Sequence, residues 1–562
     1  MKQTSLFVVL TLFIIGYSSC QTTEKSTQAV FEYFEYRGMD TRFEKEIDNR
    51  NEYFNPIISG FYPDPSICRK GEDYFLVCSS FSYFPGIPIF HSTDLVNWTQ
   101  IGHVLNRPSQ LNLDGIRLSG GIYAPAIEYN EYNDTFYLIT TCVDGIGNFI
   151  VKTDDPFSNT WSEPIPLPKV GGIDPSLFFD DDGKAYIVHN DAPEGTPEWD
   201  GHRAIWIHNF DTETDSTFGE KQVLIDGGVD RSAKPVWIEG PHIYKIGGRY
   251  YLMAAEGGTS VNHSEVILSA ENIKGPYIPY RNNPILTQRD LPEPRQDIVT
   301  SVGHADLIQT AEGDWYAVFL GCRSYEDNHY NTGRETFLLP VKWENNYPVI
   351  LDKNLAVSTV VRKENLEPND TNYLTGNFTW RDDFDKRILN DEWLFIRTPR
   401  DEWWMMADGK LVLKPTDRSI YEINNPVFIG RRQQHLIFEA ETELSFNPTT
   451  ENAIAGLVCY QNESHNFVLG KTMVDGQSVI VLNRSEKTTQ RIAELIVPDE
   501  YVQSPVKLKV KGRNDKYSFY VSFNNGIDWE IIEEDVDAKN LSTETAGGFT
   551  GVILGMYTSL SN

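Results

Sequence analysis

The strongest signal in this sequence is a short pattern that occurs five times between residues 64 and 320. A residue at or beside a proline opens each copy, followed by a short apolar strand, a turn of Gly, Asp or Asn, and an aromatic-rich strand. The copies open at Asp64, Ala124, Asp174, Glu239 and His304. Starts about 50 to 65 residues apart suit four-stranded blades joined by loops. The repeat therefore predicts a five-bladed β-propeller.

Three of the five copies open with an acidic residue: Asp64, Asp174 and Glu239. In a propeller the equivalent strand of every blade runs along the central axis, so residues at one repeat position meet there. An Asp before a proline commonly caps a turn. These three residues differ from such an Asp because they occupy related repeat positions, which predicts three carboxyl groups in one axial pocket.

The charge balance indicates which partners to expect. The chain has 49 basic and 80 acidic residues, a formal net charge of −31. This charge repels nucleic acid and anionic membrane surfaces. With 12 Trp, 28 Tyr and 30 Phe, the chain has enough flat apolar rings to line a site as well as a core, and sugars pack on such rings.

The N-terminus has the pattern of an export signal. Lys2 precedes an apolar run over residues 6–17, too short to span a bilayer, and Ser18 and Ser19 then precede Cys20. We expect residues 1–20 to be a signal peptide ending in a lipoprotein box, with Cys20 lipidated. Tyr17 departs from that box, where a small or Leu-type residue is usual. The expected location is the outer membrane or the periplasm of a bacterium, and the alternative is a plain secretory signal.

Shifts in pattern divide the remaining chain. Residues 21–51 are polar and charge-rich and are predicted to be a tether, 52–360 to be the propeller, and 361–375 to be a linker. Residues 376–562 show strands with period-two alternation and Asn-Gly turns, which favours a β-sandwich. The fold is thus predicted to be all-β. Five further cysteines, an odd number without C-x-x-C spacing, predict buried free thiols, although Cys68 and Cys78 could pair across a hairpin.

Motifs across both halves carry a resemblance to a known family. In the propeller half they are G-F-Y-P-D-P-S from residue 60, S-S-F-S-Y-F-P-G-I-P-I-F-H-S from 79, D-L-V-N-W from 94, G-G-I-Y-A-P from 120, G-I-D-P-S from 172, I-E-G-P-H from 238, V-G-H-A-D from 302 and G-R-E-T-F-L-L-P from 333. This half resembles glycoside hydrolase family 43, specifically its β-xylosidase-like members. The second half, with W-R-D-D-F-D from 380 and G-F-T-G from 548, is similar to the concanavalin-like jelly-roll sandwich that follows the propeller in many of these enzymes.

The resemblance implies an exo-acting, inverting hydrolase that releases a terminal pentose from xylo-oligosaccharides or arabinoxylan. Inversion needs two carboxyl groups about 6.5–9.5 Å apart, with a water between one of them and the sugar. By resemblance Asp64 is the general base, Glu239 the general acid, and Asp174 the residue that raises the pKa of Glu239 and orients it. A β-xylosidase is favoured, with an α-L-arabinofuranosidase or a dual-activity enzyme as the alternative.

Four further residues are assigned to the pocket by the same resemblance. Phe81 packs beside the terminal sugar, Tyr123 stands where many relatives carry Trp, and Arg334 binds sugar hydroxyls. His304 matches a histidine near the axis, where some relatives hold calcium or water; the alternative is a hydrogen-bonded core pair. No cofactor is expected to be required, and the expected partner is an oligosaccharide or polysaccharide.

Two other functions fit a five-bladed propeller. A sucrose- or fructan-cleaving enzyme would retain configuration and needs carboxyl groups only about 5–5.5 Å apart. A lectin-like propeller would bind glycans without cutting them and should lack one of the acids, whereas all three are present here. The sandwich is expected to pack on the propeller and narrow the pocket; Trp403 and Trp404 are candidate rings for a glycan-binding role.

Overall fold

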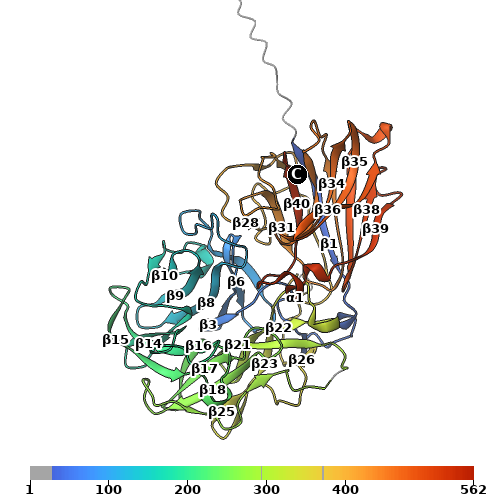
Figure 1. The fold of residues 1–562 in the computed structure, drawn as a ribbon. Coiled ribbons are helices and arrows are strands. Elements are labelled where there is room, and N and C mark those ends of the chain that lie inside the picture. Colours follow the sequence, from blue (N-terminus) through green and yellow to red (C-terminus); the bar gives the residue numbers. More distant parts are fainter. Residues whose placement is uncertain (1–27, 293, 370–372, 562) are drawn as a thin grey trace, which may run out of the picture.

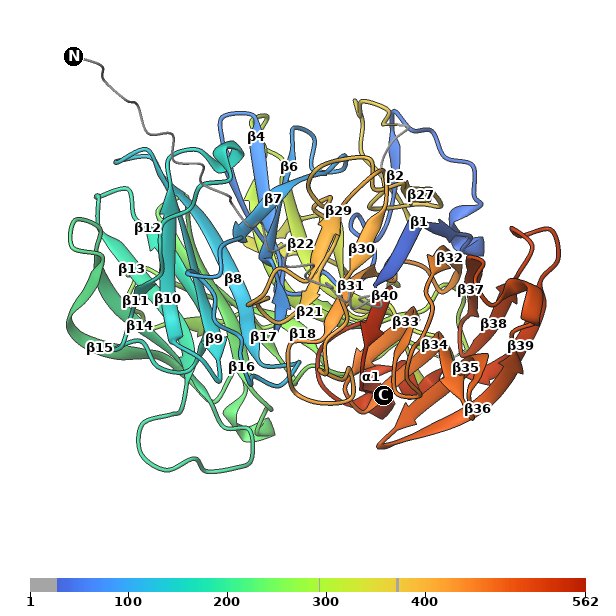
Figure 2. The ribbon, with the colours of Figure 1, turned by 90° about the horizontal axis from the view of Figure 1, so that it is seen from above.

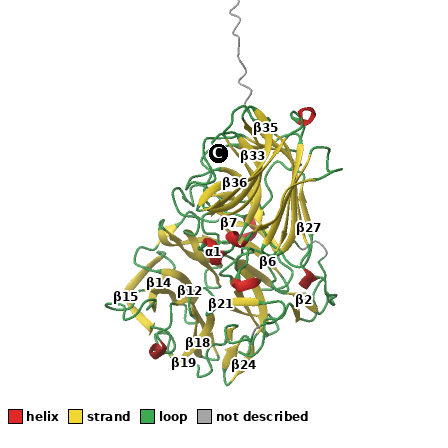
Figure 3. Cartoon of the chain, turned by 45° about the vertical axis from the view of Figure 1, so that its right-hand side comes forward, coloured by secondary structure: helices red, strands yellow, loops and turns green. Residues whose placement is uncertain are grey.

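The structure is a computed structural model that describes residues 28–292, 294–369 and 373–561. Cys20 and the predicted signal peptide lie outside these residues. Strands dominate, and the α-helix of the described residues is a single turn, α1 (Thr543–Ala546) (Figure 3). None of the helices described is long and apolar enough to cross a bilayer. The five cysteines described are all free and buried, as predicted: Cys68, Cys78, Cys142, Cys322 and Cys459.

Five antiparallel sheets form the first body, one for each sequence repeat (Figure 1). Their strands, from the axis outward, are β3 (Ser66–Lys70), β4 (Asp73–Val77), β6 (Gly86–Ser92) and β7 (Thr99–Leu105); β8 (Gly121–Asn130), β9 (Thr135–Val143), β10 (Gly147–Thr153) and β11 (Ile165–Pro166); β12 (Ile173–Phe179), β13 (Ala185–Asp191), β14 (Ala204–Asp211) and β15 (Ser216–Asp226); β16 (Ile238–Ile246), β17 (Arg249–Glu256), β18 (Ser264–Ala270) and β19 (Ile278–Pro279), with β20 (Leu286–Thr287) also on β18; and β21 (Val299–Gln309), β22 (Trp315–Arg323) and β23 (Glu335–Pro340).

The inner strands form a ring. β3, β8, β12, β16 and β21 contact one another in this order, and β21 returns to contact β3. At that junction Asp306 of β21 accepts hydrogen bonds from the Ser66 hydroxyl, at 2.8 Å, and from the Ile67 backbone N–H, at 2.9 Å. The segment before the first blade also pairs with the last one, through two backbone hydrogen bonds of 3.2 Å between Ile58 and Thr336.

The second body is a sandwich of two antiparallel sheets (Figure 2). The eight-stranded sheet contains β29 (Trp404–Met406), β30 (Leu411–Leu413), β1 (Ala29–Gly38), β32 (Ile437–Ser445), β37 (Val506–Arg513), β38 (Lys516–Ser522) and β39 (Glu530–Asp537), with β27 (Thr379–Asp382) beside β1. The six-stranded sheet contains β31 (Val427–Arg432), β40 (Ile553–Ser559), β33 (Ile454–Asn462), β34 (His465–Val474), β35 (Gln477–Glu486) and β36 (Thr488–Ile496).

The prediction of a tether over residues 21–51 is wrong where β1 lies. Phe31, Phe34 and Tyr36 are fully buried in the sandwich core, and β1 pairs with β27, β30 and β32. The alternation of aromatic and acidic residues in this segment is that of a half-buried strand. Its partners lie more than 300 residues further along the chain, so no neighbouring strand marks it in the sequence. The predicted start of the linker at 361 also falls inside a strand, β26 (Val360–Arg362), which pairs with β2 (Glu52–Phe54).

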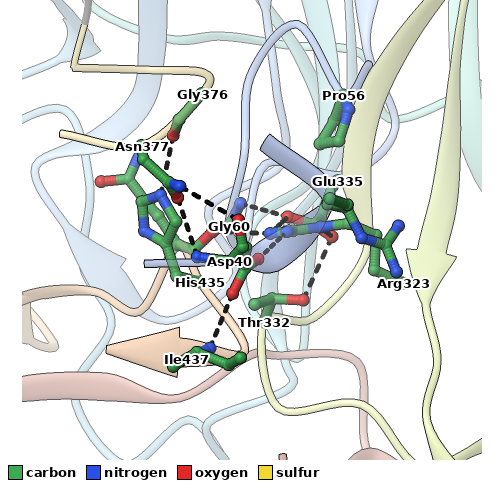
Figure 4. Close-up of polar contacts among 12 residues, drawn as sticks. Asp40, Pro56, Gly60, Arg323, Thr332, Glu335, Gly376, Asn377, His435 and Ile437 are labelled. Atoms are coloured by element: carbon green, nitrogen blue, oxygen red, sulfur yellow. Dashed lines mark hydrogen bonds and ion pairs between the residues drawn. The ribbon is translucent and has the colours of Figure 1, made fainter. Parts of the chain in front are cut away.

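A buried cluster of charges joins the two bodies (Figure 4). Arg323 at the end of β22 forms a double ion pair with Glu335 of β23, at 2.7 and 2.8 Å, and a third ion pair with Asp40, which follows β1. The Arg323 guanidinium also donates to the Gln434 carbonyl at 2.6 Å, and Asp40 accepts from the Ile437 backbone N–H at 2.6 Å. We call Asp40, Arg323 and Glu335 the clamp. Its members belong to different bodies, so it fixes how the sandwich sits on the propeller.

Candidate active site

A cavity of about 590 Å³ opens at the axial end where the inner strands begin. It brings together all seven residues that the sequence assigns to catalysis or sugar binding: Asp64, Phe81, Tyr123, Asp174, Glu239, His304 and Arg334. The carboxyl groups come from the first, third and fourth blades. The remaining lining residues were not predicted, and they are Arg117, Val143, Ile173, Val236, Trp237, Gly258, Thr259 and Phe549.

One unusual backbone conformation recurs where the inner strands meet the axis. Asp64, Ala124, Asp174, Gly240 and His304 all have positive φ, at 53°, 29°, 53°, 56° and 49°. The register shifts at the same place in β8, β12, β16 and β21, as in a β-bulge. Bulges redirect side chains, and here they point residues of several blades toward one cavity.

This conformation corrects the repeat alignment at the fourth blade. The residue equivalent to Asp64 and Asp174 is Gly240, and Glu239 stands one position earlier. A Cβ at Gly240 would lie 2.8 Å from the His304 ring, so a side chain does not fit there. The fourth blade therefore supplies its carboxyl group from the preceding residue, an offset that the E-G-P sequence contains but that repeat counting did not reveal.

Asp64 is held as a carboxylate. Its side chain is buried and accepts hydrogen bonds from Arg334 Nη1, at 3.0 Å, and from the Ser79 hydroxyl, at 2.6 Å. Burial alone would raise the pKa of Asp64, but the charges of Arg334 and His304 and the hydrogen bond from Ser79 together outweigh it and hold this pKa below its ordinary value. An ionised carboxylate is what a general base requires.

Glu239 and Asp174 have raised pKa values, in contrast to Asp64. Burial, and then the negative charge of Asp64, raises the pKa of Glu239 to about 7. Burial, and then the charge of Glu239, raises the pKa of Asp174 well above its ordinary value. We predicted that Asp174 supplies the charge that raises the Glu239 pKa. The pKa shifts favour Asp64 in this role, because burial disfavours ionisation of Asp174 itself.

Aromatic rings from both bodies form one wall of the cavity. Phe549, from the sandwich, stacks on Phe81 with ring centres 5.9 Å apart and meets Tyr123 edge-on, also at 5.9 Å. The Arg334 guanidinium lies 5.4 Å from the Phe549 ring centre. Arg334 Nε is buried and has no hydrogen-bond partner among the described residues, so it has a free donor for a ligand. The G-F-T-G motif around Phe549 was the only sequence signal for this contribution.

Trp237 lies on the wall that carries Glu239, two positions before it. The Arg203 guanidinium lies 4.5 Å from the Trp237 ring centre and donates to Asn190 Oδ1 at 2.9 Å. The positive charge of Arg203 also lowers the pKa of Glu239, against the larger effect of burial. Trp237 was missed because the fourth repeat was taken to begin at Glu239.

The surroundings of His304 bear on the expected calcium site. A cavity of about 10 Å³, room for about one water, lies along the axis beside Asp64, Asp174, His242 and His304. Calcium prefers six to eight oxygen ligands, whereas Asp64 is already engaged by Arg334 and Ser79. Within the described part of the chain no three His, Cys, Asp or Glu side chains are arranged to hold a metal ion. The donor set therefore does not fit a calcium ion held by carboxylates. His304 instead contacts Asp64, with 3.7 Å between Nδ1 and Oδ1.

Comparison with known proteins supports the two-body architecture. A xylosidase/arabinosidase of Butyrivibrio fibrisolvens is 36% identical over 518 residues, covering 90% of this chain and 95% of its own length. A non-reducing end alpha-L-arabinofuranosidase of Bacteroides ovatus is 37% identical over 515 residues, with 90% and 91% covered. The crystal structure of a GH43_12 protein from a capybara gut metagenome is 45% identical, with a TM-score of 0.88 over 95% of this chain and all of that one.

The two bodies match two parts of one family. Residues 381–562 match the beta xylosidase C-terminal concanavalin A-like domain, which corresponds to the sandwich without β1. Residues 53–348, which contain the three carboxyl groups and Arg334, match glycosyl hydrolases family 43. Because both bodies match parts of this family, and relatives that are 36% and 37% identical cover 90% of this chain, the chain belongs to glycosyl hydrolases family 43.

Proposed function

We propose that this protein is an exo-acting, inverting glycosidase that removes a terminal xylose from β-linked xylo-oligosaccharides. In this proposal Asp64 draws a proton from the attacking water and Glu239 donates a proton to the leaving oxygen. Arg334 holds Asp64 ionised and offers its free Nε to a hydroxyl of the terminal sugar. Asp174 keeps a proton close to Glu239.

The observation that carries the proposal is a pair of opposite pKa shifts inside one cavity. Asp64 has a lowered pKa because Arg334, His304 and Ser79 together outweigh its burial, whereas Glu239 has a raised pKa of about 7 because of burial and Asp64. At neutral pH this provides one ionised carboxyl group and one that is still protonated in about half of the molecules, which is the arrangement that acid–base hydrolysis of a glycoside needs.

Exo action is supported by the shape of the cavity. Phe549 and α1 come from the sandwich and lie beside the propeller loops, where Asn328 donates to Glu544 of α1 at 2.7 Å. The cavity is therefore a pocket formed by both bodies, and its volume of about 590 Å³ suits a few sugar rings and not a long chain passing through.

The proposal is tested with two variants and two leaving groups. General acid catalysis matters most for a poor leaving group, so Glu239→Ala should lose about 10²–10⁴-fold in kcat/KM on xylobiose and less on p-nitrophenyl β-xyloside. Asp64→Ala should lose activity on both, because the water must be activated in either case. Glu494→Ala, exposed on the sandwich, is the control. Full activity of Glu239→Ala on xylobiose would refute its role.

The stereochemistry provides a second test. Proton NMR during the first minutes should show α-xylose as the first anomer formed from a β-xyloside. If β-xylose appears first, the enzyme retains configuration and Asp64 is a nucleophile instead of a base.

An α-L-arabinofuranosidase activity of the same pocket is the second candidate. It is favoured by the relatives, one of which is named a xylosidase/arabinosidase and another a non-reducing end alpha-L-arabinofuranosidase. The ratio of kcat/KM for p-nitrophenyl β-xyloside to that for p-nitrophenyl α-L-arabinofuranoside decides between the two, and a ratio near one indicates a dual enzyme.

We also propose that the protein is exported and anchored through a lipid on Cys20. The support is the sequence alone: Lys2, the apolar run over residues 6–17, and Ser18-Ser19 before Cys20. Expressed in a bacterium with labelled palmitate, the wild type should carry label in the membrane fraction and Cys20→Ser should not. An unlabelled wild type whose mature N-terminus lies beyond Cys20 would favour the plain secretory signal.

A further inference from the structure

A polar cluster not used by the proposed catalysis lies at the cavity lining. Arg117 lines the cavity, and about half of its side chain is exposed to solvent (52%). Its Nε donates to Asp144 Oδ2 at 3.0 Å, and its Nη2 donates to the Tyr123 hydroxyl at 3.4 Å. Nη1 has no hydrogen-bond partner in the part of the chain that the structure describes. The guanidinium is therefore fixed on one edge and free on the other.

The orientation of this cluster depends on both bodies. The Tyr123 hydroxyl donates to the Ser119 carbonyl at 2.6 Å, and the Ser119 hydroxyl accepts from the Phe549 backbone N–H at 3.0 Å. The Tyr123 ring meets Phe81 edge-on, with centres 5.0 Å apart. Tyr123 thus contacts the aromatic wall with its ring and holds Arg117 with its hydroxyl.

This arrangement explains why Tyr, and not Trp, suits position 123. The Tyr hydroxyl donates one hydrogen bond, to Ser119, and accepts another, from Arg117. An indole N–H donates only, so a Trp at this position could not receive the Arg117 donor. The departure from the W-A-P motif and the presence of Arg117 are therefore chemically matched.

We propose that Arg117 binds the sugar on the leaving-group side of the scissile bond, so that the cluster of Arg117, Tyr123 and Asp144 sets specificity for the leaving group; this rests on the proposed function. The terminal sugar must reach Asp64 and Glu239, both at least nine-tenths buried, so the next sugar lies toward solvent, where the guanidinium is half exposed. Nη1 and the second Nη2 hydrogen can reach two neighbouring hydroxyls.

Charge indicates the chemical class of that sugar. Asp144 pairs with Arg117, so the cluster is close to neutral as a whole. A neutral pentose or hexose with vicinal hydroxyls suits it better than a uronic acid, whose carboxylate would have to compete with Asp144 for the same guanidinium.

The experiment compares two substrates that share the terminal xylose and differ in the leaving group. The leaving group of xylobiose is a xylose, which carries hydroxyls beside the scissile bond. The leaving group of p-nitrophenyl β-xyloside is p-nitrophenol, which has no sugar hydroxyls. In Arg117→Ala the ratio of kcat/KM for xylobiose to that for p-nitrophenyl β-xyloside should fall about 3- to 10-fold, the worth of one or two hydrogen bonds. Arg117→Lys should restore little of it, because an ammonium lacks the planar fork. Tyr123→Phe should lower the same ratio less.

The control is Arg491→Ala, an arginine on the sandwich with a comparable exposed ion pair, to Glu494. Its ratio should equal that of the wild type. Equal losses on both substrates in Arg117→Ala would overturn the inference, because the residue would then act on the pocket in general. A wild type that cleaves neither substrate would instead refute the proposed function, and this inference with it.

Discussion

Replacing Glu239 by Gln should stabilise the protein at neutral and alkaline pH while removing its activity. The pKa of Glu239 is raised from 4.5 to about 7 in the folded protein, so the folded state binds this proton more tightly than the unfolded chain does. The wild type therefore loses stability as the pH rises from about 4.5 to about 7, and the loss stays constant above that. Gln mimics the protonated side chain and does not ionise.

The size of the effect follows from the same shift. At about 1.36 kcal/mol for each tenfold change in proton affinity, the wild type is less stable than Glu239→Gln by about 3 kcal/mol at pH 8 and by almost nothing at pH 4. Dividing this free-energy difference by an unfolding entropy of about 2.1 cal/mol/K per residue gives a Tm difference of about 5 °C, if residues 53–348 unfold together. Asp174 adds to the gain, since its own pKa falls once Glu239 is neutral.

The assay is a set of thermal melts of both proteins between pH 4 and 8.5. The Tm difference should open between pH 4.5 and 7 and then level off. Glu494→Gln, at an exposed position, serves as the control and should show no such opening. A difference between Glu239→Gln and wild type that is the same at pH 4 and pH 8 would refute the reasoning, because the stabilisation would then not come from ionisation.

Three further outcomes are expected. Arg203→Met removes a charge that lowers the pKa of Glu239, so the alkaline limb of the kcat/KM profile should move to higher pH; an unmoved limb would contradict this role. Phe549→Ala removes the sandwich ring from the pocket and should raise KM up to about 10-fold for p-nitrophenyl β-xyloside, measured by initial rates. Arg323→Met leaves the two clamp carboxylates buried without their partner, which should cost about 3–5 kcal/mol in urea unfolding; a cost below about 1 kcal/mol would show that the clamp contributes little.

The parts predicted from sequence are those with a local signature that is repeated. In each blade a proline, an apolar run and a turn mark the inner strand in the sequence, so the number of sheets could be predicted without a structure. Because equivalent strands share the axis, Asp64 and Asp174 could be placed together from their position in the repeat. Glu239 was placed with them as the opening residue of the fourth repeat and by the family resemblance, although Gly240 is the equivalent residue.

The parts that were missed depend on contacts between distant segments. β1 looks like a polar tether because its partners lie in the second half of the chain. Phe549 reaches the pocket only because the sandwich docks on the propeller. Arg117 is oriented at the cavity by its hydrogen bonds to Asp144 and the Tyr123 hydroxyl, which the sequence does not reveal. Sequence periodicity reports which side of a strand is buried but not what covers it.

The place of β1 in the sandwich has a consequence for how the chain is assembled. During translation β1 is made before the propeller, whereas its neighbours β27 and β32 are made only after all five blades. The propeller is thus inserted into the sandwich between β1 and β27. A gene cut after the last blade would encode the aromatic strand β1 without the sheet that it joins. An isolated propeller should therefore begin near residue 50, so that β1 is left out.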